Sequence, residues 1–71
     1  MYTITQKIDR YPFIILELRL ESGELRYWFY WDDLDEILMK EYGVTDLIGL
    51  ELKELPPKGD WIPKEDIYKI P

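Results

Sequence analysis

The sequence contains no cysteine and no histidine. Disulfide frameworks need paired cysteines, and zinc fingers and iron–sulfur sites need cysteine or histidine ligands, so these classes of protein are excluded. A chain of 71 residues is near the lower size at which one hydrophobic core holds a fold without such supports. We therefore expect residues 1–71 to form a single small domain, without cofactor or metal, that is stabilised by packing or by a partner.

The same absences remove the usual catalytic nucleophiles and bases. Ser22 lies in a predicted turn, and the glycines at positions 23, 43, 49 and 59 are too scattered for a phosphate-binding loop. Paired carboxylates act as acid and base only in a cleft that gives them contrasting environments, for which a small sheet has little room. We predict that the chain is not an enzyme.

Long apolar runs are also absent. No segment approaches the roughly 20 apolar residues of a membrane-spanning helix, and the start of the chain lacks the apolar stretch of a secretory signal. We expect a soluble, cytoplasmic protein, located in the host cytoplasm if it is viral. The chain has no alanine, no asparagine and one glutamine, while 34% of its residues are charged. This composition is typical of thermophiles and suggests an archaeal or other thermophilic microbe, or a virus that infects one.

Positive charge is scarce, with nine Lys and Arg against fifteen Asp and Glu, a net charge of −6. Binding to phosphate backbones depends on clustered Lys and Arg, so this balance disfavours nucleic acid as a partner. An acidic surface instead favours a larger protein with a basic surface, toward which it would be steered.

Aromatic and β-branched residues are abundant, and several segments alternate between apolar and polar positions. Residues 2–8 are predicted to form a strand, and residues 13–20 and 25–31 two more that flank a hairpin connection at 21–24. Gly23 in this connection can adopt a positive φ. A fourth strand is predicted at 48–55, and a short closing strand at 67–70 after a turn at 63–66.

A short amphipathic helix is predicted between the third and fourth strands. Asp32 is a suitable N-cap, Leu34 and Leu38 recur at helical spacing, and Gly43 suits the position after the last turn. The predicted fold is therefore α+β, a curved antiparallel sheet of four to five short strands with one helix. The sequence leaves an open sheet and a small barrel as alternatives.

Five consecutive aromatic residues occupy positions 27–31, although a strand with one buried face needs only every second one. The hydrophobic pattern predicts that Leu20 lies opposite Leu25 and Leu16 opposite Phe29, since a one-residue slip places Arg26 on the apolar face. In that register the main core takes Tyr27, Phe29 and Trp31. The other large apolar side chains form a second face: Phe13, Ile15, Trp28 and Tyr30.

A second aromatic face left in water would reach or exceed what monomers usually expose, so we expect it to be covered. One alternative is the chain's own C-terminal segment, through Trp61, Ile62, Ile67 and Ile70. The other is a protein partner, because Trp, Tyr and Arg are over-represented among the residues that dominate interfaces.

Our leading hypothesis is a non-catalytic protein-binding module, a small acidic inhibitor or regulator that docks on a larger protein. The second face would supply the anchors, two arginines would flank them, and the acids at the helix start would steer association. The predicted partner-binding residues are Phe13, Ile15, Arg19, Arg26, Trp28, Tyr30, Asp32, Asp33, Asp35 and Glu36.

Three other hypotheses stay open. The second face could be the interface of a homodimer. Single-stranded nucleic acid could stack on Trp28 and Tyr30 with Arg19 and Arg26 on its phosphates, although neighbouring glutamates oppose this. The acids at positions 32–36 could attract Mg²⁺ or Ca²⁺, but helix capping accounts for them without a metal.

Overall fold

The computed structural model describes residues 1–31 and 33–69. Its elements are β1 (Tyr2–Arg10), β2 (Phe13–Arg19), β3 (Leu25–Trp31), α1 (Asp33–Tyr42), β4 (Glu51–Leu52), β5 (Asp60–Ile62) and the 3-10 helix η1 (Lys64–Lys69). The fold is α+β, as predicted, with an antiparallel sheet and one α-helix between the third and fourth strands.

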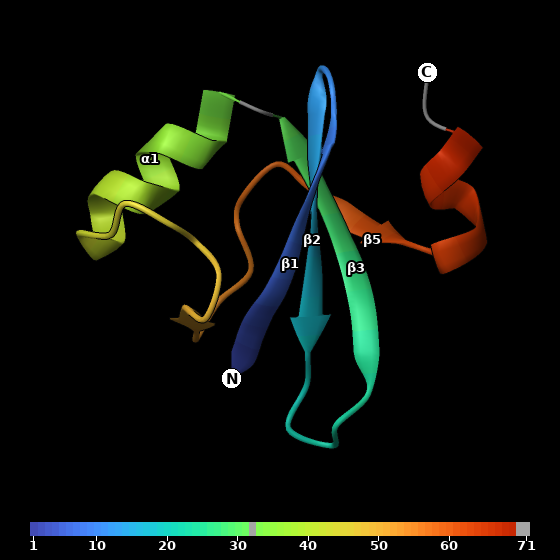
Figure 1. Cartoon of the computed structure of the whole chain (residues 1–71), viewed down its shortest axis with the longest axis horizontal. Coiled ribbons are helices and arrows are strands. Elements are labelled where there is room, and N and C mark those ends of the chain that lie inside the picture. The colour runs from blue at the N-terminus through green and yellow to red at the C-terminus, as the bar shows by residue number, and fades with distance from the viewer. Residues whose placement is uncertain (32, 70–71) are drawn as a thin grey trace.

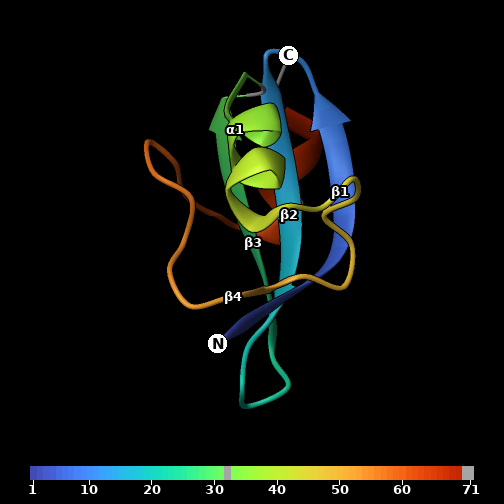
Figure 2. The same cartoon turned by 90° about the vertical axis from the view of Figure 1, so that its left-hand side faces the viewer.

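The five strands form one sheet in the order β4-β1-β2-β3-β5, and this sheet curls into a half-barrel. Helix α1 lies on its concave side and η1 on the opposite, convex side (Figures 1 and 2). The ring centroids of Tyr2 on β1 and Trp61 on β5 are 6.1 Å apart, although β2 and β3 separate the two strands. The concave side therefore closes around a core that side chains from both edges share.

The connection between β2 and β3 is shorter than the four-residue connection expected from the sequence. The Leu20 N–H donates to the Glu24 carbonyl oxygen at 2.9 Å, and the Gly23 N–H donates to the Leu20 carbonyl oxygen at 2.9 Å. Gly23 has a φ of 89°, the left-handed conformation that follows a type I turn in three-residue hairpin loops. Loop length and turn type fix hairpin register, and here they pair Leu16 with Trp28.

The predicted register of β2 and β3 is therefore wrong by one residue, and the shift exchanges the two faces of β3. Leu18 lies opposite Arg26, which is the pairing that the hydrophobic pattern argued against. Trp28 and Tyr30 pack in the concave core with Leu16 and Leu18. The five consecutive aromatics are explained because both faces of β3 are covered.

The convex side of β3 contributes to a second, smaller core under η1. Ile67 of η1 is 2% exposed and packs against Tyr27, with Phe29 and Ile62 at the margin. The C-terminal segment thus covers part of the predicted second face, as one alternative proposed, but that face is divided between the two sides of the sheet. Ile67 packs with Ile15 on the convex side, and Trp61 packs on Trp28 on the concave side. Ile70, expected to help cover the same face, lies outside the described residues.

Strand β1 contains a β-bulge at Thr5, where the pairing with β2 shifts by one residue. Strict alternation would place Ile4 and Ile8 on one face, but a bulge changes which face the following residues occupy. Ile4 is fully buried in the concave core, whereas Ile8 packs in the convex one. Lys7, opposite Leu16, is directed toward α1.

Helix α1 ends before Gly43, whose φ of 66° confirms the glycine predicted for that position. Leu38 is 6% exposed and lies at the inner face of the helix. Ile37, whose spacing from Leu34 and Leu38 in the sequence predicts the same face, is instead 59% exposed, and Asp35 is buried. The predicted N-cap, Asp32, lies outside the described residues.

The C-terminal third departs most from the predicted elements. The expected strand at 48–55 is limited to β4. Just before β4, the Gly49 N–H donates to the Ile4 carbonyl oxygen, and the Ile4 N–H donates to the Leu50 carbonyl oxygen. The prediction of a closing strand at 67–70 is wrong for residues 67–69, because these residues belong to η1, which follows Pro63 and extends to Lys69. Residue 70 lies outside the described residues. The last strand is β5, which pairs with β3.

Gly59 precedes β5 and lies against β3, so we expect Gly59→Ala to be more destabilising than Gly23→Ala. A Cβ at Gly59 would overlap with the Phe29 carbonyl oxygen and the Trp28 indole, and such overpacking costs about 2–3 kcal/mol. A Cβ at Gly23 has open space, so only its left-handed φ is penalised, by about 1 kcal/mol. Urea unfolding measures both losses, and equal values would contradict the packing described for β5.

Candidate functional site

The residues predicted to form one binding face lie on different sides of the sheet. Phe13 and Ile15 are on the convex side, whereas Trp28 and Tyr30 are on the concave side. Ile15 and Tyr30 are both 0% exposed, so neither can contact a partner in this structure. Trp28 is half-buried and packs edge-to-face on Trp61, with 5.2 Å between ring centroids. The expected aromatic face, for docking or for dimerisation, is not formed.

The two arginines expected beside that face are also separated. Arg26 is on the concave side, where its guanidinium lies 4.3 Å from the ring centroid of Trp61. Arg19 is exposed on the convex side of the hairpin. The surface expected for stacking single-stranded nucleic acid required both arginines and two aromatic rings on one face, and these residues do not form it.

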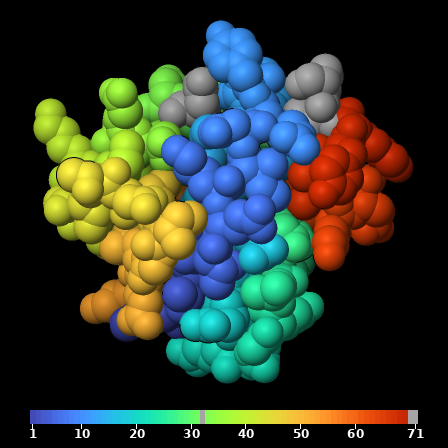
Figure 3. Space-filling view, in the orientation of Figure 1, coloured from blue at the N-terminus to red at the C-terminus, as the bar shows by residue number. Residues whose placement is uncertain are grey.

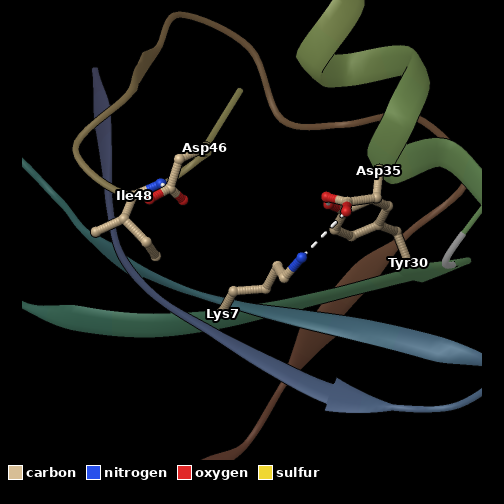
Figure 4. Close-up of polar contacts among 5 residues, drawn as sticks. All are labelled: Lys7, Tyr30, Asp35, Asp46 and Ile48. Atoms are coloured by element: carbon tan, nitrogen blue, oxygen red, sulfur yellow. Dashed lines mark hydrogen bonds and ion pairs between the residues drawn. The ribbon is translucent and has the colours of Figure 1, made fainter. Parts of the chain in front are cut away.

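Asp35, expected to be an exposed acid, is instead the centre of a buried polar network (Figure 4). It is 9% exposed, and its carboxylate accepts hydrogen bonds from the Tyr30 hydroxyl at 3.2 Å and the Lys7 ammonium at 3.1 Å. Burial raises the pKa of Tyr30 well above its usual value, and the negative charge of Asp35 and their hydrogen bond raise it further. The network joins α1 to β1 and β3, so it stabilises the fold.

A second polar network lies on the convex side. The Tyr27 hydroxyl donates to one carboxylate oxygen of Glu17 at 2.8 Å, and the Thr5 hydroxyl donates to the other at 2.8 Å. The hydrogen bond to Glu17 raises the pKa of Tyr27, with a further contribution from burial. Because Thr5 is the bulged residue, this network holds the bulge in place.

Two exposed aromatic side chains border a shallow groove near the turn between β1 and β2. Tyr11, which forms a cis peptide bond with Pro12, is 81% exposed, and Trp31 is 48% exposed. The Trp31 ring lies on Phe13, with 4.8 Å between centroids. We call this feature, of about 500 Å³, the Tyr11–Trp31 groove; it is lined by Tyr11, Pro12, Trp31, Asp33, Leu34 and Lys58.

The groove is not predicted from the sequence, because the register predicted from the hydrophobic pattern places Trp31 in the main core. Only the three-residue turn at Gly23, through the register it imposes, places Trp31 on the side of Phe13. Tyr11 directly precedes Pro12, a pattern that predicts only an extended or turn conformation. The glycine at the third loop position was the one available signal for the shorter turn and hence for an outward Trp31.

Acidic side chains lie beside the Tyr11–Trp31 groove. Asp33 lines it, Glu36 is exposed one helical turn later, and both line a neighbouring shallow groove with Asp9. Acids in the first helical turn stabilise the helix dipole, so Asp33 and Glu36 also have a structural role. Within the described residues, no three acidic side chains converge as metal ligands. The groove therefore has an acidic margin, with Lys58 as a positive residue in its lining.

No family model, curated protein or solved structure matches this chain. Neither helix in the described part of the chain has the length and apolarity needed to cross a membrane. Function must accordingly be inferred from the side chains and their geometry.

Tyr30→Phe removes a hydrogen bond to a buried carboxylate, and we expect it to lower the free energy of unfolding by about 1–2 kcal/mol near neutral pH. Since folding raises the pKa of Tyr30 from 10.0, this contribution is complete below that pH and is lost as the pH rises above it. The loss caused by Tyr30→Phe in urea unfolding should therefore stay the same from neutral pH up to about pH 9 and shrink as the pH rises beyond 10.0. Tyr11→Phe, at an exposed site, is the control; a loss from Tyr30→Phe that does not change with pH would contradict this assignment.

Proposed function

We propose that this chain is a non-catalytic protein-binding module that docks on a basic surface of a larger protein through the Tyr11–Trp31 groove and its acidic margin. The observation that carries the proposal is the exposure of two aromatic side chains beside one groove, 81% for Tyr11 and 48% for Trp31. Large aromatic residues are enriched among the interface positions that contribute most to binding energy.

Trp31 is suited to be the central anchor because the protein already holds its ring in place. It packs against the Phe13 ring in a tilted arrangement, and Phe13 in turn packs edge-to-face on Phe29, with 5.5 Å between centroids. A side chain that is ordered before binding loses little conformational entropy in the complex. A flexible exposed ring would contribute less affinity for the same contact area.

The charge around the groove supports a basic partner. Asp33 lies in the groove lining beside Trp31, and Glu36 and Asp9 extend the acidic margin. An arginine or lysine side chain placed over the Trp31 ring could form a cation–π contact and an ion pair with Asp33 at the same time. The net charge of −6 would also accelerate association with a positively charged surface.

In this proposal the chain acts as a cytoplasmic inhibitor or regulator. A small acidic protein can occupy a basic functional surface of a larger enzyme or defence protein without any chemistry of its own. The charged, amide-poor composition supports an archaeal or viral source, and in the viral case a host protein as the target.

The test compares proteins captured from native host cells by the wild type, by Trp31→Ala and by Tyr68→Ala. Tyr68 is 77% exposed and lies on η1, so its substitution removes an aromatic ring away from the groove. We expect a captured protein to bind the wild type and Tyr68→Ala with similar affinity, and Trp31→Ala at least about tenfold more weakly.

Circular dichroism and thermal melting of each variant verify that the fold is retained. Asp33→Lys provides a second variant, and we expect it to weaken the same interaction most at low salt. The proposal is wrong if no protein is retained, or if the retained protein binds Trp31→Ala as well as the wild type.

A further inference from the structure

The outer edge of β1 is open along most of its length. Toward β4, only Tyr2 and Thr3 pair with a strand, and Ile4 exchanges hydrogen bonds with the loop that precedes β4. Beyond Ile4, none of the described residues forms a strand against this edge, although β1 continues to Arg10. Figure 3 shows the β1 segment in blue at the surface, between the α1 side and the η1 side.

The hydrogen-bond pattern shows which backbone groups face this open edge. Leu20 bonds to Glu24 across the β2–β3 hairpin, and in an antiparallel ladder alternate residues bond to opposite neighbours. Even-numbered residues of β2 therefore bond to β3, and Ile15, an odd-numbered residue, bonds to its partner Ile8 on β1. It follows that Lys7 and Asp9 direct their N–H and C=O groups away from β2.

We propose that two copies of this chain pair antiparallel along the β1 edge, about a twofold axis at Ile8. In this register Lys7 lies opposite Asp9 of the second copy, and both bond through their outward backbone groups. Symmetry repeats the pair, so the interface contains two Lys–Asp contacts on the concave side. Ile8 lies opposite Ile8 of the second copy on the convex side, at the non-hydrogen-bonded position where side chains approach most closely.

Charge selects this register over its neighbours. Outward backbone groups are present at alternate residues only, so a shift by one residue loses the ladder hydrogen bonds. The next registers that keep these bonds place Lys7 opposite Lys7 or Asp9 opposite Asp9, and like charges directly opposite are unfavourable. Centring the axis at Ile8 is the arrangement that pairs opposite charges twice.

The usual protection of edge strands is incomplete here. Natural edges are blocked by charged side chains and bulges. The bulge of β1 is at Thr5, at the margin of the open segment, and the ammonium of Lys7 is already paired with Asp35 at 3.1 Å. An ammonium group has three donors, so Lys7 can donate a further hydrogen bond to the carboxylate of Asp9 of the second copy. Asp9 itself is exposed.

The other edges offer less. The outermost strands are short, two residues for β4 and three for β5. On β3, the outer side is occupied by β5 at Tyr27–Phe29, which leaves only short free ends. The dimer does not depend on the proposed function, because the Tyr11–Trp31 groove can bind a foreign protein in either oligomeric state.

Sedimentation equilibrium of the wild type between about 1 µM and about 1 mM tests the dimer. We expect reversible association of the 8.7 kDa chain to a dimer within this range, strengthened by added salt because each copy carries a net charge of −6. Hydrogen exchange gives the site: the amides of Lys7 and Asp9 should become protected at high concentration, while those of Gln6 and Ile8 are protected throughout.

Asp9→Lys and Glu54→Lys form a matched pair, since each raises the net charge from −6 to −4 at an exposed acid. General repulsion alone would make both variants associate more tightly. Edge pairing predicts instead that Asp9→Lys, which opposes lysines across the axis, dissociates at least about tenfold more readily than Glu54→Lys. A wild type that stays monomeric throughout, amides at 7 and 9 that stay unprotected, or equal association of the two variants would overturn the proposal.

Discussion

The three-residue turn at Gly23 is the constraint on which the arrangement of the sheet depends. The turn pairs Leu20 with Glu24, and this sets the register of the whole β2–β3 hairpin. A shift of this register by one residue would move every side chain of β3 to the opposite face of the sheet. With the observed register, Tyr30 reaches Asp35 under α1, and Trp31 remains at the surface. The concave core and the candidate binding surface are therefore two consequences of one local conformation.

The β-bulge at Thr5 has a similar role on β1. It divides that strand into a part whose Ile4 enters the concave core and a part whose Ile8 enters the convex one. The same shift directs Lys7 toward Asp35, which neutralises a carboxylate that would otherwise be buried without a cation. Covering both faces of the sheet thus requires local irregularities at Thr5 and Gly23.

Much of the fold is predictable from the sequence because each element has its own local signal. The strands have β-branched and aromatic residues, and Gly43 marks the end of the helix. Register is different: with apolar residues on both faces of β2 and β3, the hydrophobic pattern fits either alignment almost equally well. Of the candidate site, the acids Asp33 and Glu36 are predictable from the helix start, whereas the exposure of Trp31 depends on the register and is not. In the sequence, Asp35 resembles an ordinary acid in the first turn of a helix. Its burial beside Tyr30 depends on the register, which the sequence pattern does not determine.

The register of β2 and β3 can be measured directly by nuclear Overhauser contacts between Hα atoms across the hairpin. In the described structure, Ile15 faces Phe29 and Glu17 faces Tyr27 at non-hydrogen-bonded positions, where opposing Hα atoms are closest. Strong Hα–Hα contacts are therefore expected for these two pairs. Contacts shifted by one residue, with Leu16 opposite Phe29, would contradict the described register, because Trp28 and Tyr30 would then leave the concave core.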